Sequence, residues 1–502
     1  MWSRLSLLLA AVIPIALTPA LSAQERAHPT ADKLGTVHFQ TSCATSVAPG
    51  FDRGVALLHS FEFAASMREF QAVITADSTC AMAWWGIALA RWSNPMAPNI
   101  RPPAAIAAGM EAVDAARRAS SRATPRERDY IEAVAQLYSD AGTRNQQERL
   151  AGYEAAMAQV AARNPADTEA RIFHALALVQ SASPSDKTYA KQRQAGAILE
   201  GLFRSQPDHP GLAHYIIHAY DVPALADQAI GAAERYSAIA PAAAHALHMP
   251  SHTFTQVGMW KESVHANLLS MDAAIAQGSL AEALHAADYA VYADLQLGQD
   301  TAALAIVQRL PEIAERFDPK AITGAAPGSA GVFALAAIPA RYAVERGAWK
   351  QAAALPVARS DYPFADAVTW FARALGAARA GDTIAAGIAT DTLSALQKRL
   401  ADAGEAYWAE QVAIQHLGAS AWRDFAAGRT QQALARMRQA VEREVATEKS
   451  AISPGPLAPA QELLGDMLLE LGRRDEAVAE YRASLQREPG RRRSEEGVRR
   501  AS

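Results

Sequence analysis

The feature that most constrains this chain is a pattern that recurs about every 34 residues along most of its length. The clearest copy lies near the C-terminus. There Gly465 and Ala477 are the small residues, Leu468 and Tyr481 are the apolar ones, and Pro489 closes the unit. Small residues let two helices approach closely, and a proline ends the second helix. The pattern therefore predicts helical hairpins that bury their apolar faces by stacking on one another.

This copy resembles the tetratricopeptide-repeat (TPR) family, whose pattern is W-x2-L-G-x2-Y, then A-x3-F, then P. The residues at repeat positions 7, 8, 11, 15, 20, 24 and 32 are Leu464, Gly465, Leu468, Gly472, Ala477, Tyr481 and Pro489. The first copy has Gly54, Leu57 and Phe70 in the matching positions. The resemblance covers nearly all of residues 48–491. It implies an all-α fold, a right-handed superhelical α-solenoid of about ten TPR-like hairpins.

Three segments lie outside the repeats. Residues 1–23 combine Arg4, an apolar run and small residues ending at Ala23, which predicts a signal peptide cleaved after Ala23. Residues 24–47 are interpreted as an extended lead-in, and residues 492–502 as a disordered tail. Breaks in the repeat are expected at residues 94–103, 181–187, 321–329 and 450–459.

The signal peptide predicts an exported protein, most simply in a Gram-negative periplasm, with secretion beyond it left open. No later apolar stretch approaches the roughly 20 residues of a membrane span, so we do not expect this chain to be an integral membrane protein. In an oxidising compartment the two cysteines, Cys43 and Cys80, are predicted to form a disulfide. Closing a loop of about 38 residues would stabilise the fold by roughly 3–4 kcal/mol in the chain-entropy model. One buried thiol and one loop thiol is the alternative.

Histidines gather in the middle of the chain, where five of the thirteen lie within thirty-nine residues. Two trios have a spacing that places all three side chains on one face of a helix. The first trio is His214, His218 and Asp221. The second trio, one repeat later, is His245, His248 and His252.

The TPR resemblance gives these trios a position in the fold. With Pro241 at repeat position 32, and Gly258 and Gly298 at position 15 of the next two repeats, eight polar groups fall at positions 2, 5, 9 and 12. In the TPR family these positions of the first helix line the concave groove. The eight residues are His214, His218, Asp221, His245, His248, His252, His285 and Asp288. They are expected to converge from neighbouring helices about 10 Å apart.

Imidazoles and a carboxylate held on rigid helices suit a transition metal such as Zn, Cu or Fe. We assign His214, His218, His248 and His252 as metal ligands, and Asp221, His245, His285 and Asp288 as ligand-binding groups. Two alternatives remain open. The groove is polar and binds a ligand without metal, or the histidines have only a structural role.

Pro250 lies inside the predicted first helix, between His248 and His252. It removes a backbone hydrogen bond and is expected to kink the helix at a cost of about 3 kcal/mol. We interpret the kink as a device that directs His252. Alternatively the helix begins at Pro250, which would leave His245 on the preceding loop.

Several chemistries are disfavoured. HYIIH has the spacing of the zinc-protease HExxH motif but carries Tyr215 in place of the catalytic Glu. No GxSxG, GxGxxG or Walker loop occurs, and a formal net charge of −4 argues against a nucleic-acid partner.

The histidine stretches also resemble those of exported bacterial TPR proteins. The sequence therefore predicts an exported TPR binding protein whose His-rich groove, residues 214–288, holds a ligand through a transition metal. The partner is a protein, a peptide or a small molecule. A metal-dependent hydrolase or redox enzyme and a metal-free interaction scaffold are the alternatives, and no catalytic residue is assigned.

Overall fold

The computed structural model describes residues 33–97 and 100–502, and all regular elements within them are helices. The predicted signal peptide, residues 1–23, lies outside the described residues. The described part of the lead-in is extended up to a 3-10 turn at Thr45–Val47. It packs against the array through Leu34 and Phe39, which are buried, and through a hydrogen bond from Thr36 N to Asp208 O of 2.9 Å.

The helices of the first half are α1 (Ala48–His59), α2 (Phe63–Ala76), α3 (Ala81–Trp92), α4 (Pro103–Ala119), α5 (Pro125–Ala135), α6 (Gln146–Arg163), α7 (Thr168–Ser181), α8 (Ala190–Phe203), α9 (Pro210–Ala219), α10 (Ile230–Ile239), α11 (Ala244–His248), α12 (Pro250–Gln256) and α13 (Trp260–Gln277). Those of the second half are α14 (Leu280–Gln296), α15 (Asp300–Arg316), α16 (Gly328–Glu345), α17 (Trp349–Ala353), α18 (Pro363–Arg379), α19 (Thr383–Asp402), α20 (Ala406–Ala426), α21 (Thr430–Val445), α22 (Ala460–Glu470), α23 (Arg474–Arg487) and α24 (Arg492–Ala501).

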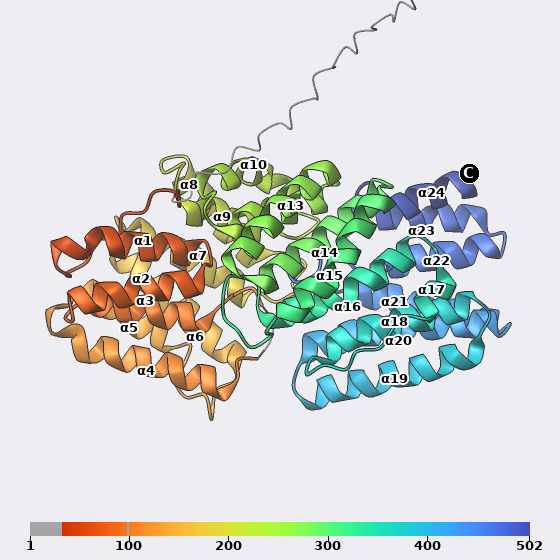
Figure 1. The fold of residues 1–502 in the computed structure, drawn as a ribbon, viewed down its shortest axis with the longest axis horizontal. Helices are drawn as coiled ribbons and strands as arrows, with labels where there is room; N and C mark the ends of the chain where they lie inside the picture. The colour runs from red at the N-terminus through yellow and green to blue at the C-terminus, as the bar shows by residue number, and fades with distance from the viewer. Residues whose placement is uncertain (1–32, 98–99) are drawn as a thin grey trace, which may run out of the picture.

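Successive helices pair into hairpins, and the hairpins stack along the chain (Figure 1). The described residues form eleven hairpins when α11 and α12 are taken together as one first helix. The prediction of an all-α solenoid of TPR-like hairpins is confirmed.

The packing of each hairpin explains the repeat pattern. A Cβ on Gly465 would lie 2.8 Å from the ring of Tyr481, so only glycine lets α22 and α23 approach this closely. Gly258, Gly298 and Gly472, at repeat position 15, have φ of 76°, 71° and 72°. This left-handed conformation suits glycine and turns the chain between the two helices of a hairpin.

The predicted disordered tail is wrong, because Arg492–Ala501 forms helix α24. Arg491 and Arg493, at the start of α24, both bind the buried carboxylate of Glu462, at 2.7 and 2.9 Å. A Cβ on Gly497 would lie 2.4 Å from the ring of Tyr481, which shows how closely α24 packs on α23. The arginine-rich end therefore packs into the array as a further helix.

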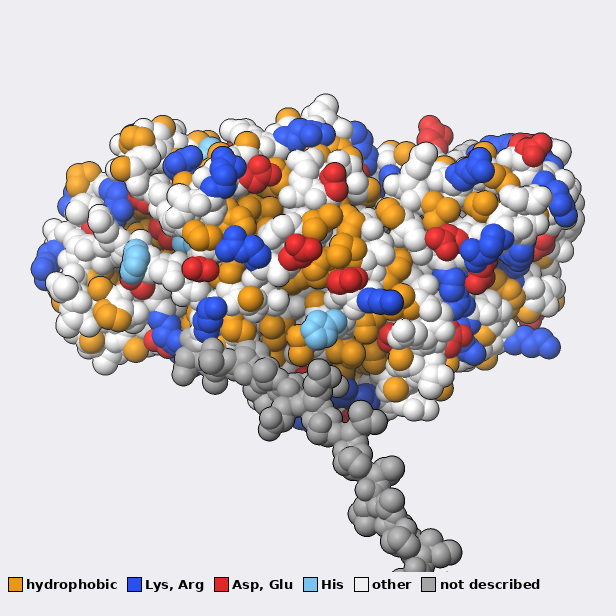
Figure 2. Space-filling view, turned by 90° about the horizontal axis from the view of Figure 1, so that it is seen from above, with side chains coloured by type: hydrophobic (Ala, Val, Ile, Leu, Met, Phe, Trp, Pro, Cys, Tyr) orange, Lys and Arg blue, Asp and Glu red, His pale blue; other side chains and the backbone are white. Residues whose placement is uncertain are grey.

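Cys43 and Cys80 are joined by a disulfide that ties the lead-in to the N-cap of α3. No helix of the described residues is long and apolar enough to cross a bilayer. On the face seen in Figure 2, positive and negative side chains are interspersed among hydrophobic ones, with no large field of one sign.

Candidate metal centre

The middle of the array carries six histidines whose rings contact one another, which we call the six-histidine cluster. They are His214 and His218 on α9, His245 and His248 on α11, His252 on α12 and His285 on α14. These elements belong to three consecutive hairpins at the centre of the array (Figure 1). All six side chains are buried, with exposed fractions from 0% to 7%.

The sequence predicted these residues on first helices lining a concave groove, whereas the structure buries all six side chains. Segments 93–97, 317–327 and 446–459 run past the cluster, and their residues Met96, Pro327 and Ile452 line a small cavity together with the histidines. Each segment coincides with a predicted break in the repeat. The breaks therefore cover the cluster and remove it from solvent.

Pro250 interrupts the helix that carries three of the six histidines. Helix α11 ends at His248 and α12 begins at Pro250, because proline has no N–H to continue the helical hydrogen bonds. The interruption leaves His245 on α11, not on the preceding loop. His248 and His252 then face each other across the break.

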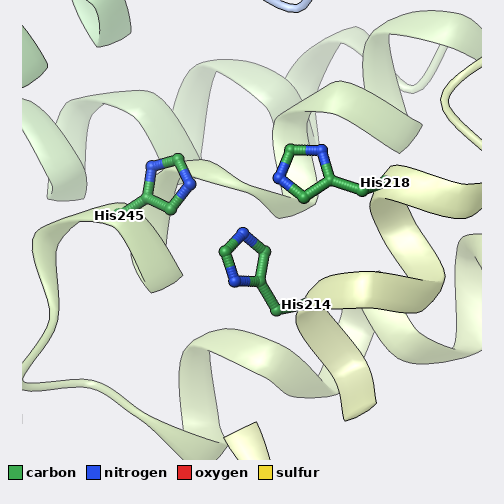
Figure 3. Close-up of side chains that lie close together, drawn as sticks. All are labelled: His214, His218 and His245. Atoms are coloured by element: carbon green, nitrogen blue, oxygen red, sulfur yellow. The ribbon is translucent and has the colours of Figure 1, made fainter. Parts of the chain in front are cut away.

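The first triad consists of His214, His218 and His245, which offer one ring nitrogen each within 4.8 Å of one another. Figure 3 shows the three rings turned toward a common space, two from one helix and the third from the neighbouring hairpin. The Nε2 atoms of all three are buried and have no hydrogen-bond partner. Three unpartnered nitrogens therefore converge.

The second triad consists of His248, His252 and His285, whose ring nitrogens likewise lie within 4.8 Å of one another. The Nε2 atoms of His248 and His252 are 3.0 Å apart. The Nδ1 atom of His285 is buried and unpartnered. Each triad therefore offers three nitrogen donors of the kind that a metal ion binds.

Four of the six rings form a hydrogen bond through Nδ1, the nitrogen on the outer side of the cluster. His245 Nδ1 lies 2.9 Å from Glu282 Oε1, and His252 Nδ1 lies 2.8 Å from Asp221 Oδ2. Because an ionised carboxylate only accepts hydrogen bonds, both Nδ1 atoms carry the hydrogen. Likewise His214 Nδ1 donates to the carbonyl oxygen of His59 at 2.6 Å.

His248 Nδ1 lies 2.7 Å from Asn267 Oδ1, and the amide nitrogen of Asn267 donates to Ser263 O at 2.7 Å. The oxygen of Asn267 therefore accepts, and His248 also carries its hydrogen on Nδ1. The lone pair of Nε2 is then directed into the cluster in four of the six histidines. This outer hydrogen bonding is typical of metal-ligating histidines.

Burial favours the neutral form of five of the cluster imidazoles. It lowers the pKa of His214, His218 and His285 well below the ordinary value, with neighbouring histidines adding to the effect. It lowers the pKa of His248 to about 3, and it also lowers that of His252 although Asp221 opposes the shift. Neutral imidazole is the form that binds a metal ion.

The neighbouring carboxyl groups differ in the direction of their pKa shifts. Burial alone would raise the pKa of Glu282, but His245 outweighs it and the pKa falls to about 2. The pKa of Asp221 falls as well, since Lys449 and His252 outweigh burial. Burial and the charge of Glu282 raise the pKa of Glu62 to about 8. Asp221 and Glu282 are therefore the anionic partners of the cluster.

Two acidic residues of the predicted site have other positions than expected. Asp221 lies beyond the end of α9 at Ala219, so it does not share the helix face of His214 and His218, and it contacts His252 instead. The carboxylate of Asp288 is paired with Arg341 at 2.9 Å and takes no part in either triad.

The sequence analysis missed Glu282 and Asn267. Glu282 precedes His285 by three residues on α14, one helical turn away, and that spacing was an available signal. Asn267 lies on α13, the second helix of its hairpin, and no motif marks it.

A third group, which the sequence analysis also missed, joins His59 and His209 to the buried carboxylate of Glu169. Both Nε2 atoms lie 2.9 Å from Glu169 oxygens, and Tyr215 OH lies 3.0 Å from His59 Nδ1. Burial raises the pKa of Glu169, but the two histidines outweigh it and the net shift is downward. Because the Nε2 atoms of both histidines already hydrogen-bond the carboxylate, we interpret this group as a support that holds the His59 carbonyl for His214.

A wider cavity of about 120 Å³, measured as space open to the centre of a water-sized sphere, lies on the other side of segment 446–459. Phe333, Tyr407 and Trp408 line it with apolar surface. Gln411 Nε2 and Gln415 Oε1, from the same face of α20, are buried without a partner.

No protein-family model and no curated protein matches the chain. Among solved structures, yeast Tom70 is similar with 10% identity over 90% of this chain and 87% of that chain, at a TM-score of 0.35. The Cut9–Hcn1 hetero-tetramer of the APC/C is similar with 12% identity over 91% of this chain and 76% of that chain, at a TM-score of 0.37. The human IFIT1 dimer with m7Gppp-AAAA is similar with 11% identity over 79% of this chain and 86% of that chain, at a TM-score of 0.36. At these identities and TM-scores the likenesses carry no argument about function.

Proposed function

We propose that this protein is a metalloprotein in which the six-histidine cluster binds two transition-metal ions, one in each triad. The observation that supports this most strongly is the pair of Nε2 atoms of His248 and His252, which lie 3.0 Å apart. Both rings carry their hydrogen on Nδ1, so two lone pairs face each other. A cation bound to both nitrogens turns this repulsion into attraction.

The distances fit such an ion. A tetrahedral ion with metal–nitrogen bonds of about 2.0–2.1 Å places two of its ligand nitrogens roughly 3.3 Å apart. The observed 3.0 Å in the second triad is close to this value. The nitrogens of each triad lie within 4.8 Å, so small side-chain rotations bring all three into a common shell. Three histidines leave a fourth position open, as in catalytic metal sites.

If the histidines had a purely structural role, the free-energy cost of burying their unpartnered nitrogens would have no compensation. The unpartnered nitrogens of His214, His218, His245 and His285 are buried. Each buried polar atom without a partner costs about 1–3 kcal/mol. Coordination of metal ions offsets this cost at four places at once.

The stacked hairpins also support a binding function, because such an array presents a long surface to partners. A protein or peptide partner on that surface, or a small molecule in the wider cavity beside Trp408, is part of the same proposal. We further propose export, with residues 1–23 as the signal peptide. The Cys43–Cys80 disulfide supports an oxidising compartment.

The test is the metal content of the purified mature chain, residues 24–502, measured by plasma mass spectrometry after loading and desalting. We expect two equivalents in the parent, one in His218→Ala, one in His248→Ala and none in the double variant. His265→Ala, which changes an exposed histidine outside the cluster, is the matched control and retains two. Equal metal content in the parent and the double variant would refute the proposal and favour the metal-free scaffold.

A further inference from the structure

A small cavity borders both triads. It is lined by His218 and His245 of the first triad and by His252 and His285 of the second. Its volume is about 20 Å³, measured as space open to the centre of a water-sized sphere. A space of this size accommodates about one molecule the size of water. Whatever reacts at the cluster in this conformation is therefore very small.

The rest of the cavity wall is almost entirely apolar. It consists of Met96, Ala97, Ala326, Pro327, Ala330, Ala451 and Ile452, with Asn94 as the remaining polar residue. The side chain of Asn94 is already used, since it donates to Ala325 O at 3.1 Å and accepts from Met96 N at 2.8 Å. With the ring nitrogens bound to metal, a water molecule finds few hydrogen-bond partners here. An apolar molecule has no hydrogen bonds to lose when it enters the cavity.

An anionic ligand is disfavoured as well. The nearest cation, Lys449, is paired with Asp221 at 3.2 Å, and Arg341 is paired with Asp288 at 2.9 Å. Neither is left to balance a buried negative charge. The protein's own side chains therefore supply no partner for an anionic ligand, and the apolar wall favours an uncharged molecule.

The charge around the cluster bears on which ions the triads hold. Three carboxyl groups contact cluster histidines, those of Asp221, Glu282 and Glu62, and one ammonium group, that of Lys449, stands beside them. Asp221 and Glu282 are the anionic partners of the cluster, and together with Lys449 they give a formal charge of −1. Two monovalent ions would leave an excess of one positive charge in the buried site, whereas two divalent ions would leave an excess of three. Imidazole suits copper, and copper(I) is the monovalent transition-metal ion that accepts three nitrogen ligands.

We propose that the two triads hold a pair of copper(I) ions and that an uncharged diatomic molecule of the dioxygen class binds in the cavity between them. This inference rests on the proposed metal function and specifies its metal and substrate class. When dioxygen binds, each copper(I) gives up one electron, so two copper(II) ions form and the dioxygen unit receives two electrons. The O–O bond is retained, and no further reductant is consumed in this step.

The test uses the full mature chain loaded with copper(I) under anaerobic conditions. Copper content is measured first, then the carbon monoxide stretch by infrared spectroscopy, then oxygen uptake with an electrode. We expect two copper ions, a carbon monoxide band below the frequency of the free gas, and one dioxygen consumed per copper pair.

Filling the cavity separates ligand binding from metal binding. Ala330→Leu projects into the cavity from α16, and it is expected to retain two copper ions while oxygen uptake falls at least tenfold and the carbon monoxide band is lost. Ala337→Leu is the matched control, because it adds the same volume to a buried alanine two turns along α16 that does not line the cavity. Ala97→Leu, from a different wall, replaces Ala330→Leu if that variant does not fold.

The outcomes distinguish the two proposals. A parent that binds two copper ions but neither carbon monoxide nor dioxygen overturns the inference and leaves the metal function standing. A parent that binds no copper but binds two zinc ions overturns the choice of metal. A parent that binds no metal refutes the proposed function. A cavity-filled variant that reacts like the parent overturns the location of the diatomic molecule.

Discussion

His248 and His252 face each other with their Nε2 atoms 3.0 Å apart, and the outer hydrogen bonds of the two rings assign each ring's hydrogen to Nδ1. The reason lies outside the pair. Asn267 and Asp221 each accept a hydrogen bond from the Nδ1 of one ring and thereby fix its tautomer. On the proposed function, the second triad is thus preorganised for a cation, and such preorganisation is what outer contacts contribute to metal sites.

The role of Asp221 gives the first prediction. Asp221→Asn weakens the acceptor of His252 Nδ1 and removes a negative charge next to the second triad. We expect metal affinity at one of two sites to fall about 10–100-fold, as for other outer partners of metal-binding histidines. Competition with a coloured chelator measures it. Asp227→Asn, at an exposed position on the same segment, is the control. An affinity within twofold of the parent would contradict the assigned role.

Metal removal gives the second prediction. Because the ions bind the folded chain, saturation raises the free energy of unfolding by about 4 kcal/mol per site when free metal is 1,000 times the Kd. Chelation should therefore lower the Tm of the parent and leave that of the His218→Ala/His248→Ala variant unchanged. Calorimetry with and without chelator checks this. Equal shifts in both proteins would place the stabilising metal elsewhere.

The histidines also predict how stability depends on pH in the metal-free protein. Burial lowers the folded-state pKa of five cluster histidines, those at 214, 218, 248, 252 and 285. In the unfolded chain they titrate near pH 6.5. Below that pH the unfolded state binds protons that the folded state does not. Stability is therefore complete above pH 6.5 and is lost as the pH falls, by up to about 1.4 kcal/mol per pH unit for each histidine.

Buried carboxyl groups with raised pKa, such as Glu62, oppose this trend. A comparison with His285→Gln cancels their contribution, because both proteins contain them. Urea unfolding between pH 7 and pH 5 should show a smaller decline for His285→Gln than for the parent. Identical slopes would mean that His285 is protonated in the folded protein.

The C-terminal helix gives a further prediction. Arg491 is buried and pairs with the buried carboxylate of Glu345 at 2.8 Å, so removing Arg491 leaves Glu345 as an unpaired buried charge. We expect Arg491→Met to lower the free energy of unfolding by about 3–5 kcal/mol, and Arg491→Met with Glu345→Met to lower it less. Urea unfolding of the metal-free proteins measures both. If the double variant is the less stable one, the charge argument fails.

The architecture was predictable because the repeat pattern directly reports helix contacts. Gly465 and Tyr481 are spaced as they are because the ring of Tyr481 packs against the backbone of Gly465, and the same register placed the cluster histidines on first helices. The tail was mispredicted because its arginines find their partners far away along the chain, at Glu462 and Asp300.

The site was less predictable than the fold. Periodicity does not describe the path of irregular segments, so nothing in the repeat indicated that Pro327 and Ile452 would cover the histidines. The departure of Asp221 from the helix face follows from the end of α9 at Ala219, which no strong signal marks. The outer partner Asn267 depends on how two hairpins meet.

The most direct test of the account is X-ray absorption spectroscopy at the metal edge of the loaded full mature chain. The account predicts about three nitrogen ligands per ion near 2.0 Å, with the multiple-scattering pattern of imidazole rings. The spectrum of His248→Ala should retain that of the first triad alone. A first shell of sulfur or carboxylate oxygen, without imidazole scattering, would contradict the six-histidine centre.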